Sequence, residues 1–308
     1  MQNEFIIRVE SVSKIFKKKN IIINALDLVS LKIKKGEIFA LIGPNGAGKT
    51  TLIKLMLNFI FPTKGNIFIH NYSVSSKASR KYLGYVPEEI KFPFKFSAFS
   101  FLKQFVRVSG SELISPKEHI LYLLHKLNLK ESTHSINNFS KGMKKRLSIA
   151  YALLTNPDIL ILDEPTDGLD PMERKTIMNM ILDFKSNGGT VFLCSHILTE
   201  VEKLCDKFAI IQKGKIIYEG IKEEFEYNGF QVKFINQNYD NTISNIINRF
   251  VIEYDGHEGK AFALNETELS ELLLALAQNK FTVTEIISKK DSLESIYFNY
   301  LKDKGEKR

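Results

Sequence analysis

One segment of the chain, GPNGAGKT at positions 43–50, has residue types and spacing that suit phosphate binding. It matches the pattern G-x-x-x-x-G-K-[ST], between the apolar run 37–42, typical of a buried strand, and a helical pattern that begins at Lys49. Glycines let backbone N–H groups turn inward around an anion, and the helix directs its positive dipole end there. Lys49 then reaches the terminal phosphates, and the Thr50 hydroxyl can ligate Mg²⁺. A glycine-rich turn that only caps a helix is the alternative, which the complete strand–loop–helix pattern disfavours.

Two adjacent carboxylates follow a second apolar run. Residues 159–162, Ile-Leu-Ile-Leu, predict a buried strand that ends at Asp163 and Glu164. Asp163 can hold Mg²⁺ beside the phosphates, usually through water, and Glu164 is a candidate general base for an attacking water. Two solvated acids at a sheet edge are the alternative, which the four apolar residues before them disfavour. A phosphate-binding loop alone leaves kinases and GTPases open.

The order of five further segments narrows the class of phosphate-binding protein. They are Phe16, YVPE at 85–88, FSKGM at 139–143 followed by KKRLSIA, GLD at 168–170 and SH at 195–196. Together with the loop and the acids, they closely resemble the nucleotide-binding subunit of an ATP-binding-cassette (ABC) transporter, over residues 5–221. This combination is far more specific than any single motif. The segment SLESIYF at 292–298 is similar to the closing helix of an exporter-type subgroup.

The sequence departs from the family pattern at two of these segments. The signature, usually Leu-Ser-Gly-Gly-Gln, has Phe139, Lys141 and Met143 at its first, third and fifth positions. Ser140 and Gly142 remain, and they supply the hydroxyl and the close backbone approach that a γ-phosphate needs. YVPE at 85–88 stands where the family has its Q-loop, and Glu88 replaces the usual glutamine there. Its carboxylate can face Mg²⁺ or water but donates a hydrogen bond only when protonated.

The resemblance implies a site that binds ATP and Mg²⁺ and hydrolyses ATP. The implied metal ligands are Thr50, Asp163 and Glu88. The implied catalytic residues are Lys49, Glu164 as the base that polarises water, and His196 as the residue that positions it. The implied nucleotide-binding residues are Phe16, which stacks on adenine, and Gly43, Pro44, Asn45, Gly46, Ala47, Gly48, Lys49, Thr50, Thr51, Ser140, Gly142 and Asp170. Two subunits of such proteins enclose two ATP molecules, each between the loop of one chain and the signature of the other.

The strands and helices that must position these residues alternate along the chain, which favours a mainly parallel α/β sheet. The resemblance implies a P-loop NTPase (RecA-like) core with an antiparallel β-subdomain and an inserted helical subdomain. We expect this nucleotide-binding domain to occupy 1–221, with its helical insertion at about 95–150. Residues 222–308 predict a small accessory α+β domain, in which Asn265 and Glu268 begin a helix with a capping-box pattern.

The composition of the chain excludes disordered and fibrous proteins. The chain of 308 residues has 44% apolar and 25% charged residues, which is ordinary for a globular protein. Residues 1–221 carry 32 Lys+Arg against 20 Asp+Glu, whereas residues 222–308 carry 11 against 15. A basic body of this kind suits phosphates, nucleic acid or an anionic membrane face. The sequence has no signal-peptide pattern and no apolar run of about 18 residues, and its two cysteines favour buried, reduced thiols.

We therefore expect an ATPase on the cytoplasmic face of the membrane, held there by a separate transmembrane permease. Its other partners are ATP and a second copy of itself or a related ATPase subunit. The alternative is a soluble ABC-type ATPase of nucleic acid or ribosomes, which usually has two cassettes, a long coiled coil or zinc ligands. A nucleic-acid partner is therefore the less favoured hypothesis, and the signature and His196 disfavour a kinase. Phenylalanines at 92, 94, 96, 99, 101 and 105 either dock the permease or pack the helical insertion.

Overall fold

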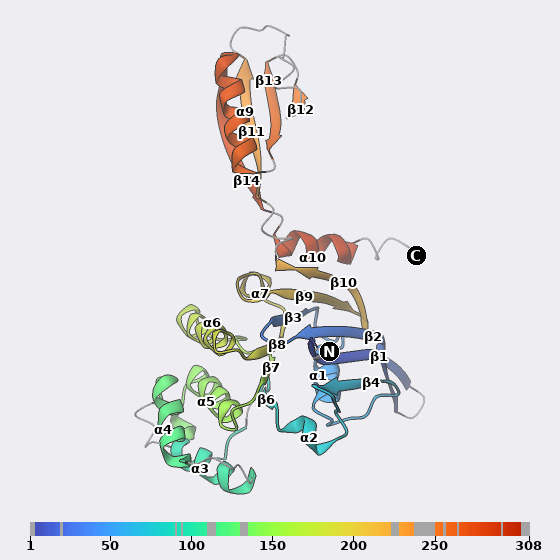
Figure 1. Cartoon of the computed structure of the whole chain (residues 1–308), viewed down its shortest axis with the longest axis vertical. Helices are drawn as coiled ribbons and strands as arrows, with labels where there is room; N and C mark the ends of the chain where they lie inside the picture. The colour runs from blue at the N-terminus through green and yellow to red at the C-terminus, as the bar shows by residue number, and fades with distance from the viewer. Residues whose placement is uncertain are drawn as a thin grey trace. The chain divides into compact units, whose positions relative to one another are not determined.

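The computed structural model describes residues 4–18, 21–89, 91–93, 95–109, 115–129, 135–222, 228–236, 250–254, 257–263, 265–290 and 292–302. The chain divides into two compact units, Met1–Gly220 and Ile221–Arg308 (Figure 1). Within the described ranges, no helix is both long and apolar enough to span a bilayer.

The first unit contains a sheet with the strand order β10-β9-β3-β8-β7-β6. Its strands are β3 (Ile38–Ile42), β6 (Leu83–Val86), β7 (Ile159–Asp163), β8 (Thr190–Ser195), β9 (Lys207–Gln212) and β10 (Lys215–Ile221). β3 is parallel to β8 and β9, and β7 is parallel to β6 and β8. Every residue of β3, β7 and β8 is buried, which explains their continuous apolar sequences. The predicted α/β core is confirmed.

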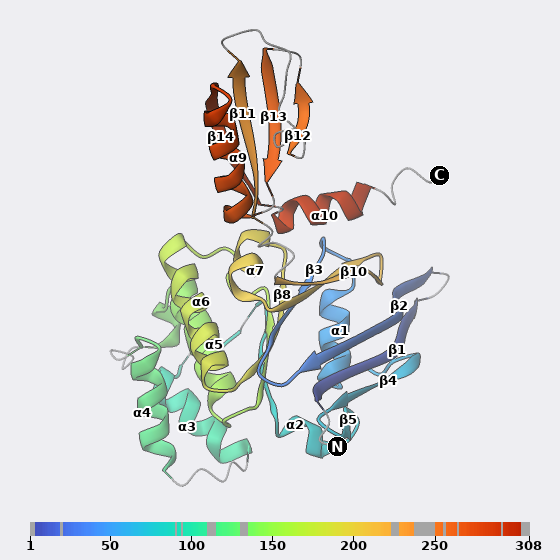
Figure 2. The ribbon, with the colours of Figure 1, turned by 45° about the horizontal axis from the view of Figure 1, so that its top comes forward.

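A second, antiparallel sheet of the first unit has the strand order β2-β1-β4-β5. It consists of β1 (Phe5–Lys18), β2 (Ile21–Lys34), β4 (Lys64–Ile69) and β5 (Tyr72–Ser73). Helix α1 (Lys49–Met56) lies between the two sheets (Figure 2). Leu52, Ile53 and Leu55 on this helix are fully buried in a core cluster that includes residues of both sheets. The helix therefore receives its fixed position from packing on two sides.

Six further α-helices occur in the described residues of the first unit. Helices α3 (Ala98–Ser109), α4 (Pro116–Lys126) and α5 (Lys141–Leu153) group together, with the 3₁₀ turn Ile136–Asn138 before α5 (Figure 1). The others are α2 (Lys77–Arg80), α6 (Pro171–Ser186) and α7 (Leu198–Leu204). Helices α3 and α4 and most of α5 lie within the range of about 95–150 where the helical insertion was expected. Pro116 starts α4 because proline suits the first position of a helix.

Most of the described phenylalanines between 92 and 105 pack against other side chains. The rings of Phe101 and Phe105 lie 5.6 and 4.2 Å from the ring of Tyr151 on α5, and Phe92 meets Phe101 edge-on at 5.2 Å. Phe96 is 39% exposed. Packing of the helical insertion therefore accounts for Phe92, Phe101 and Phe105. Phe94 lies outside the described residues.

The second unit has its own sheet, with the strand order β12-β13-β11-β14. The strands are β11 (Asn228–Asn236), β12 (Val251–Tyr254), β13 (Glu258–Ala263) and β14 (Phe281–Lys290), with helices α9 (Glu266–Gln278) and α10 (Leu293–Lys302). The chain passes from β13 through α9 to β14, with β11 between the two strands, which is a split β-α-β arrangement. The Asn265 side chain accepts a hydrogen bond from the Glu268 amide at 2.8 Å, as its capping pattern predicted.

The two cysteines provide a direct test of this fold. Cys194 on β8 and Cys205 after α7 are both completely buried, and burial raises the pKa of the Cys194 thiol well above its usual value. We expect both thiols to react with DTNB at least about 100-fold more slowly in the native chain than in urea, because reaction requires local opening. Rapid labelling of the native protein would contradict the burial of β8.

Candidate functional site

The glycine-rich loop joins the end of β3 to the start of α1, as predicted. Gly46 has φ +79° and Gly48 has φ +115°, a backbone region that side chains with a Cβ rarely adopt. A Cβ on Gly43 would lie 2.4 Å from the carbonyl oxygen of Ile211 on β9. The glycines are therefore required both by local conformation and by the close approach of β9. The loop presents its backbone N–H groups and the N-terminus of α1 to an anion.

Lys49 links the loop to the neighbouring acid. Its Nζ donates a hydrogen bond to the carbonyl of Gly43 at 2.6 Å and lies 3.2 Å from Oε1 of Glu164. Both side chains are more than 90% buried, so their ion pair is only weakly screened by water. A phosphate group bound in the loop would compete with Glu164 for the Lys49 ammonium.

Glu164 and His196 meet where β7 and β8 end. The Nδ1 atom of His196 lies 2.8 Å from Oε2 of Glu164, and the His196 backbone N–H donates to the same oxygen at 3.2 Å. Glu164 itself has φ +45°, an uncommon conformation for a residue with a side chain. The two oxygens of this carboxylate thus face a lysine and a histidine, which fixes their direction.

Asp163 is a suitable ligand for a divalent cation. Burial raises the pKa of its carboxyl group, and a hydrogen bond with Thr50 opposes that shift. Its Oδ1 atom is buried and has no hydrogen-bond partner among the described residues. An orphaned carboxylate oxygen beside a threonine hydroxyl fits Mg²⁺, which takes oxygen ligands. Glu88 is exposed, and its charge also raises the pKa of Asp163.

Most of the predicted nucleotide-binding residues line one cavity of about 500 Å³ in the first unit. This volume is within the range of small-molecule sites. The predicted residues among its lining are Phe16, Pro44, Asn45, Gly46, Gly48, Lys49, Thr50, Thr51, Glu88 and Glu164. The structure therefore brings together the phosphate loop, the strand-end acid and Phe16. The ring of Phe16 is 39% exposed, with the ammonium of Lys14 at 5.0 Å from its centre.

Sequence reasoning missed the part of the cavity that comes from the turn between β9 and β10. Lys213 and Gly214 line the cavity, together with Ile23, Asn24 and Ala25 of β2. The Gly214 N–H donates to the Ala47 carbonyl at 2.8 Å, so the turn supports the phosphate loop. Gly214 between two β-type runs marks a turn, but no local signal shows that this turn contacts Ala47.

Ser140, Gly142 and Asp170 are not among the described lining residues of that cavity. Ser140 caps α5, with its Oγ accepting from the Met143 N–H at 3.1 Å, and Asp170 caps α6 through the Glu173 N–H at 2.9 Å. A Cβ on Gly142 would lie 2.3 Å from the carboxyl carbon of Glu173. The end of this flexible side chain can move aside, so the contact with α6 does not by itself require a glycine at 142.

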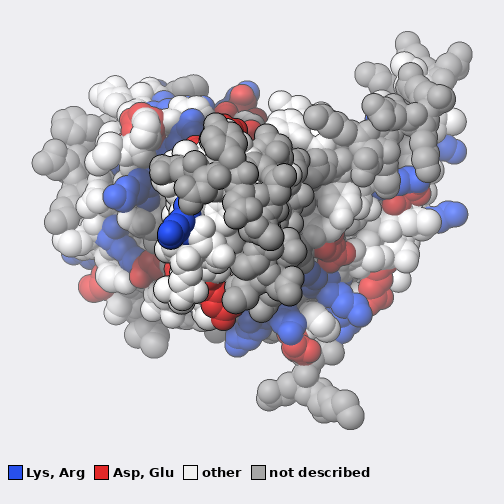
Figure 3. All heavy atoms as spheres, turned by 90° about the horizontal axis from the view of Figure 1, so that it is seen from above, with Lys and Arg blue, Asp and Glu red and all other residues white. Residues whose placement is uncertain are grey.

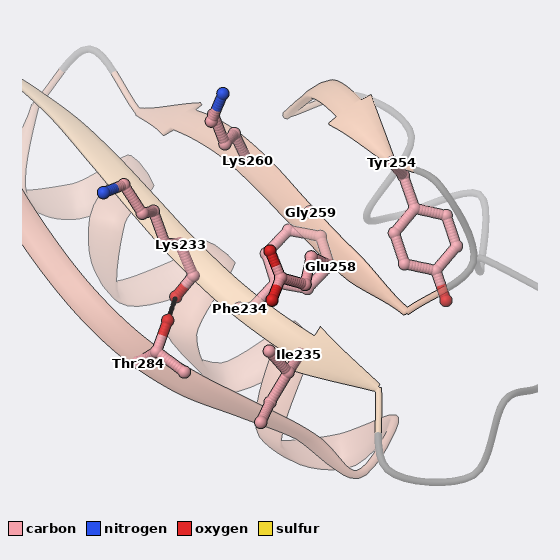
Figure 4. Close-up of a pocket in the computed structure, with 8 residues that line it drawn as sticks. All are labelled: Lys233, Phe234, Ile235, Tyr254, Glu258, Gly259, Lys260 and Thr284. Carbon is pink, nitrogen blue, oxygen red and sulfur yellow. Dashed lines mark hydrogen bonds between the residues drawn. The ribbon is translucent and has the colours of Figure 1, made fainter.

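The second unit also contains a cavity, of about 660 Å³ (Figure 4). It is lined by Lys233, Phe234, Ile235, Tyr254, Glu258, Gly259, Lys260 and Thr284, and the Thr284 hydroxyl donates to the Lys233 carbonyl at 3.2 Å. None of the predicted nucleotide-binding or catalytic residues belongs to it. The candidate site is therefore the smaller cavity of the first unit.

The charged side chains are mixed on the face that Figure 3 shows. Lysines and arginines alternate there with aspartates and glutamates over the described atoms. Proteins that bind nucleic acid usually gather their basic residues into a patch or stripe. The described atoms of this face show no continuous basic track.

Comparisons with known proteins identify the family of the chain. Residues 26–167 match the family described as ABC transporter. The lantibiotic transport ATP-binding protein SrtF of Streptococcus pyogenes is 38% identical, over 72% of this chain and 92% of its own length. YxlF, an uncharacterized ABC transporter ATP-binding protein of Bacillus subtilis, is 31% identical over 94% of this chain and 97% of its own length. The dimeric post-hydrolysis state of the cassette MJ0796 bound to ADP and Pi has a TM-score of 0.64 and 26% identity, covering 70% of this chain and 98% of that one.

Fold, site and relatives define a P-loop ATPase of the cassette type. The chain belongs to the ABC transporter ATP-binding proteins. It is an ATP-binding, ATP-hydrolysing subunit of a transporter.

The steric requirement at Gly48 can be tested with a matched glycine. A Cβ there would lie 2.8 Å from the Ala25 carbonyl oxygen, whereas a Cβ on Gly36, with φ +80°, meets no atom within 4 Å. We expect Gly36→Ala to lower the free energy of unfolding by about 1 kcal/mol from backbone strain alone, and Gly48→Ala by about 3 kcal/mol. Urea unfolding without nucleotide measures both. Equal losses would contradict the close approach of β2 to the loop.

Proposed function

We propose that the first unit hydrolyses ATP by direct attack of a water molecule on the γ-phosphorus, with Glu164 as the general base. The observation that carries this proposal is the pair of contacts made by one carboxylate, with Lys49 at 3.2 Å and His196 at 2.8 Å, beside a phosphate-binding loop. Binding of the triphosphate draws the Lys49 ammonium toward the β- and γ-phosphates, which releases Glu164 to accept a hydrogen bond from water.

The proposed reaction balances at these groups. The water oxygen bonds to the γ-phosphorus as the bond to the β–γ bridging oxygen breaks, and one water proton passes to a carboxylate oxygen of Glu164. His196 orients the water, and Lys49 and the inward N–H groups stabilise the negative charge on the phosphates. Thr50, Asp163 and Glu88 would hold Mg²⁺, which neutralises phosphate charge. Phe16 stacks on the adenine ring.

A second site component must come from a second subunit, either another copy of this chain or a related ATPase. Ser140, Gly142 and Asp170 stand near the N-termini of α5 and α6, outside the described lining of the cavity. Their amide groups suit the γ-phosphate of an ATP held by the partner. The dimeric state of the similar cassette MJ0796 supports this arrangement.

The function also requires a separate transmembrane permease, which holds the subunit on the cytoplasmic face of the membrane. ATP-driven association and release of two subunits moves the permease between two access states. Phe59 and Phe61, 65% and 66% exposed, are candidate contacts, because large apolar rings in water favour a partner surface. The ring of Phe59 lies edge-on to Tyr85 at 6.1 Å, which places it beside β6.

The role of Glu164 is tested by Glu164→Gln, which keeps the shape of the side chain and removes the base. We expect the variant to bind MgATP and to lose about 100- to 10,000-fold in kcat. It should also accumulate as an ATP-bound dimer in size-exclusion chromatography. Glu118→Gln, on the exposed first turn of α4, is the control. Normal turnover by Glu164→Gln would exclude this residue as the base.

The role of Lys49 is tested by Lys49→Ala, with Lys54→Ala on the exposed side of the same helix as its control. Loss of a charge-assisted contact to phosphate should weaken MgATP binding by about 100-fold, as measured by isothermal titration calorimetry. The control should bind as the wild type does. Unchanged affinity in Lys49→Ala would remove the phosphate-loop assignment.

The permease partner is tested by capture of the tagged chain from detergent-solubilised membranes. We expect a polytopic membrane protein to co-purify, and we expect Phe59→Ser with Phe61→Ser to reduce its yield at least about fivefold through loss of buried apolar area. Leu121→Ser, at an exposed position on α4, is the matched control. Undiminished capture by the double variant would exclude these rings as the contact.

A further inference from the structure

Lys145 on α5 is a buried cation to which neither the motifs nor the proposed reaction gives a role. Its residue is only 3% exposed. Its Nζ donates to three backbone carbonyl oxygens, those of Pro87 at 3.1 Å, Glu88 at 2.9 Å and Glu164 at 3.2 Å. A lysine ammonium has three N–H donors, so these contacts use all of them.

The three carbonyls belong to segments that matter for the reaction. Pro87 and Glu88 follow β6, Glu164 follows β7, and these two strands are parallel neighbours. Lys145 itself lies five residues after Ser140, on the helix that Ser140 caps. One ammonium group therefore links the signature helix to the segments that follow two strands, which contain Glu88 and Glu164.

Simple packing does not explain a cation at this position. Burial lowers the pKa of the Lys145 ammonium to about 8, which reflects the cost of removing its charge from water. An apolar side chain of similar length would fill the same space without that cost. The charge is therefore useful only for what it holds, which is the main chain at 87, 88 and 164.

The backbone of Glu164 needs such support. Its φ of +45° is unfavourable for a residue with a Cβ and persists only where the surroundings hold it. Its N–H donates to the Cys194 carbonyl at 3.0 Å, and its carbonyl accepts from Lys145. The peptide groups on both sides of the Glu164 Cα are thus fixed, which sets the direction of the carboxylate toward Lys49 and His196.

We propose that Lys145 is a positioning residue that holds Glu164 in its left-handed conformation and joins it to Glu88 and the signature helix. This inference rests on the proposed role of Glu164 in hydrolysis. A signature helix that moves when it meets the ATP of the partner subunit changes these three hydrogen bonds. Lys145 thereby makes the direction of the base depend on the state of the dimer interface.

The test compares Lys145→Met with Lys144→Met, the same change one residue earlier on the helix. In the full chain, with its permease present if turnover requires it, Lys145→Met should lower kcat about 100-fold, because a misdirected base loses the productive geometry. The KM for MgATP should change less than about twofold, since the phosphate loop is untouched. Lys145→Gln retains two N–H donors, so its kcat should be about tenfold higher than that of Lys145→Met.

Several outcomes would overturn the proposal. These are an unchanged kcat in folded Lys145→Met, a loss confined to KM, or an equal fall in kcat in Lys144→Met. If Lys145→Met does not fold, the same kcat-to-KM comparison between Lys145→Gln and Lys144→Gln decides. Full turnover by Glu164→Gln would instead contradict the proposed function, so the two failures are distinguishable.

Discussion

The Glu164 carboxylate is the point on which the arrangement of the first unit depends. It stands between the Lys49 ammonium and the His196 ring, which come from α1 and from the end of β8. These groups meet because β3, β7 and β8 are parallel neighbours, so the loops that follow them leave the sheet at one edge. Because the Lys49–Glu164 ion pair is buried, it is strong and directional. An incoming phosphate can replace Glu164 as the partner of the Lys49 ammonium.

The phosphate loop depends on support from outside its own sequence. In the β9–β10 turn, the Gly214 N–H donates a hydrogen bond to the Ala47 carbonyl. β2 approaches Gly48, and β9 approaches Gly43, too closely for a Cβ at either position. The loop thus has a fixed shape before any ligand arrives, which reduces the ordering cost of binding. The antiparallel sheet therefore contributes to the nucleotide site as well as to the core.

The sequence was sufficient to predict local structure where a strand or helix pattern and reactive residues occur in the same short segment. The run 37–50 and the run 159–164 each combine a buried strand with reactive residues, and the structure gives both as predicted. The turn at Lys213 and Gly214 and the three contacts of Lys145 were missed, because they join segments far apart in the sequence. The roles of Ser140, Gly142 and Asp170 stay predictions, because they involve a second subunit.

The most direct test of the account is hydrogen exchange at the backbone amides of residues 43–50, except Pro44, which has no N–H, with and without a non-hydrolysable magnesium ATP analogue. If these N–H groups hold the triphosphate, the nucleotide should slow their exchange markedly, and amides of β13 in the second unit should not change. Saturating nucleotide that leaves exchange across 43–50 unaltered would contradict the account.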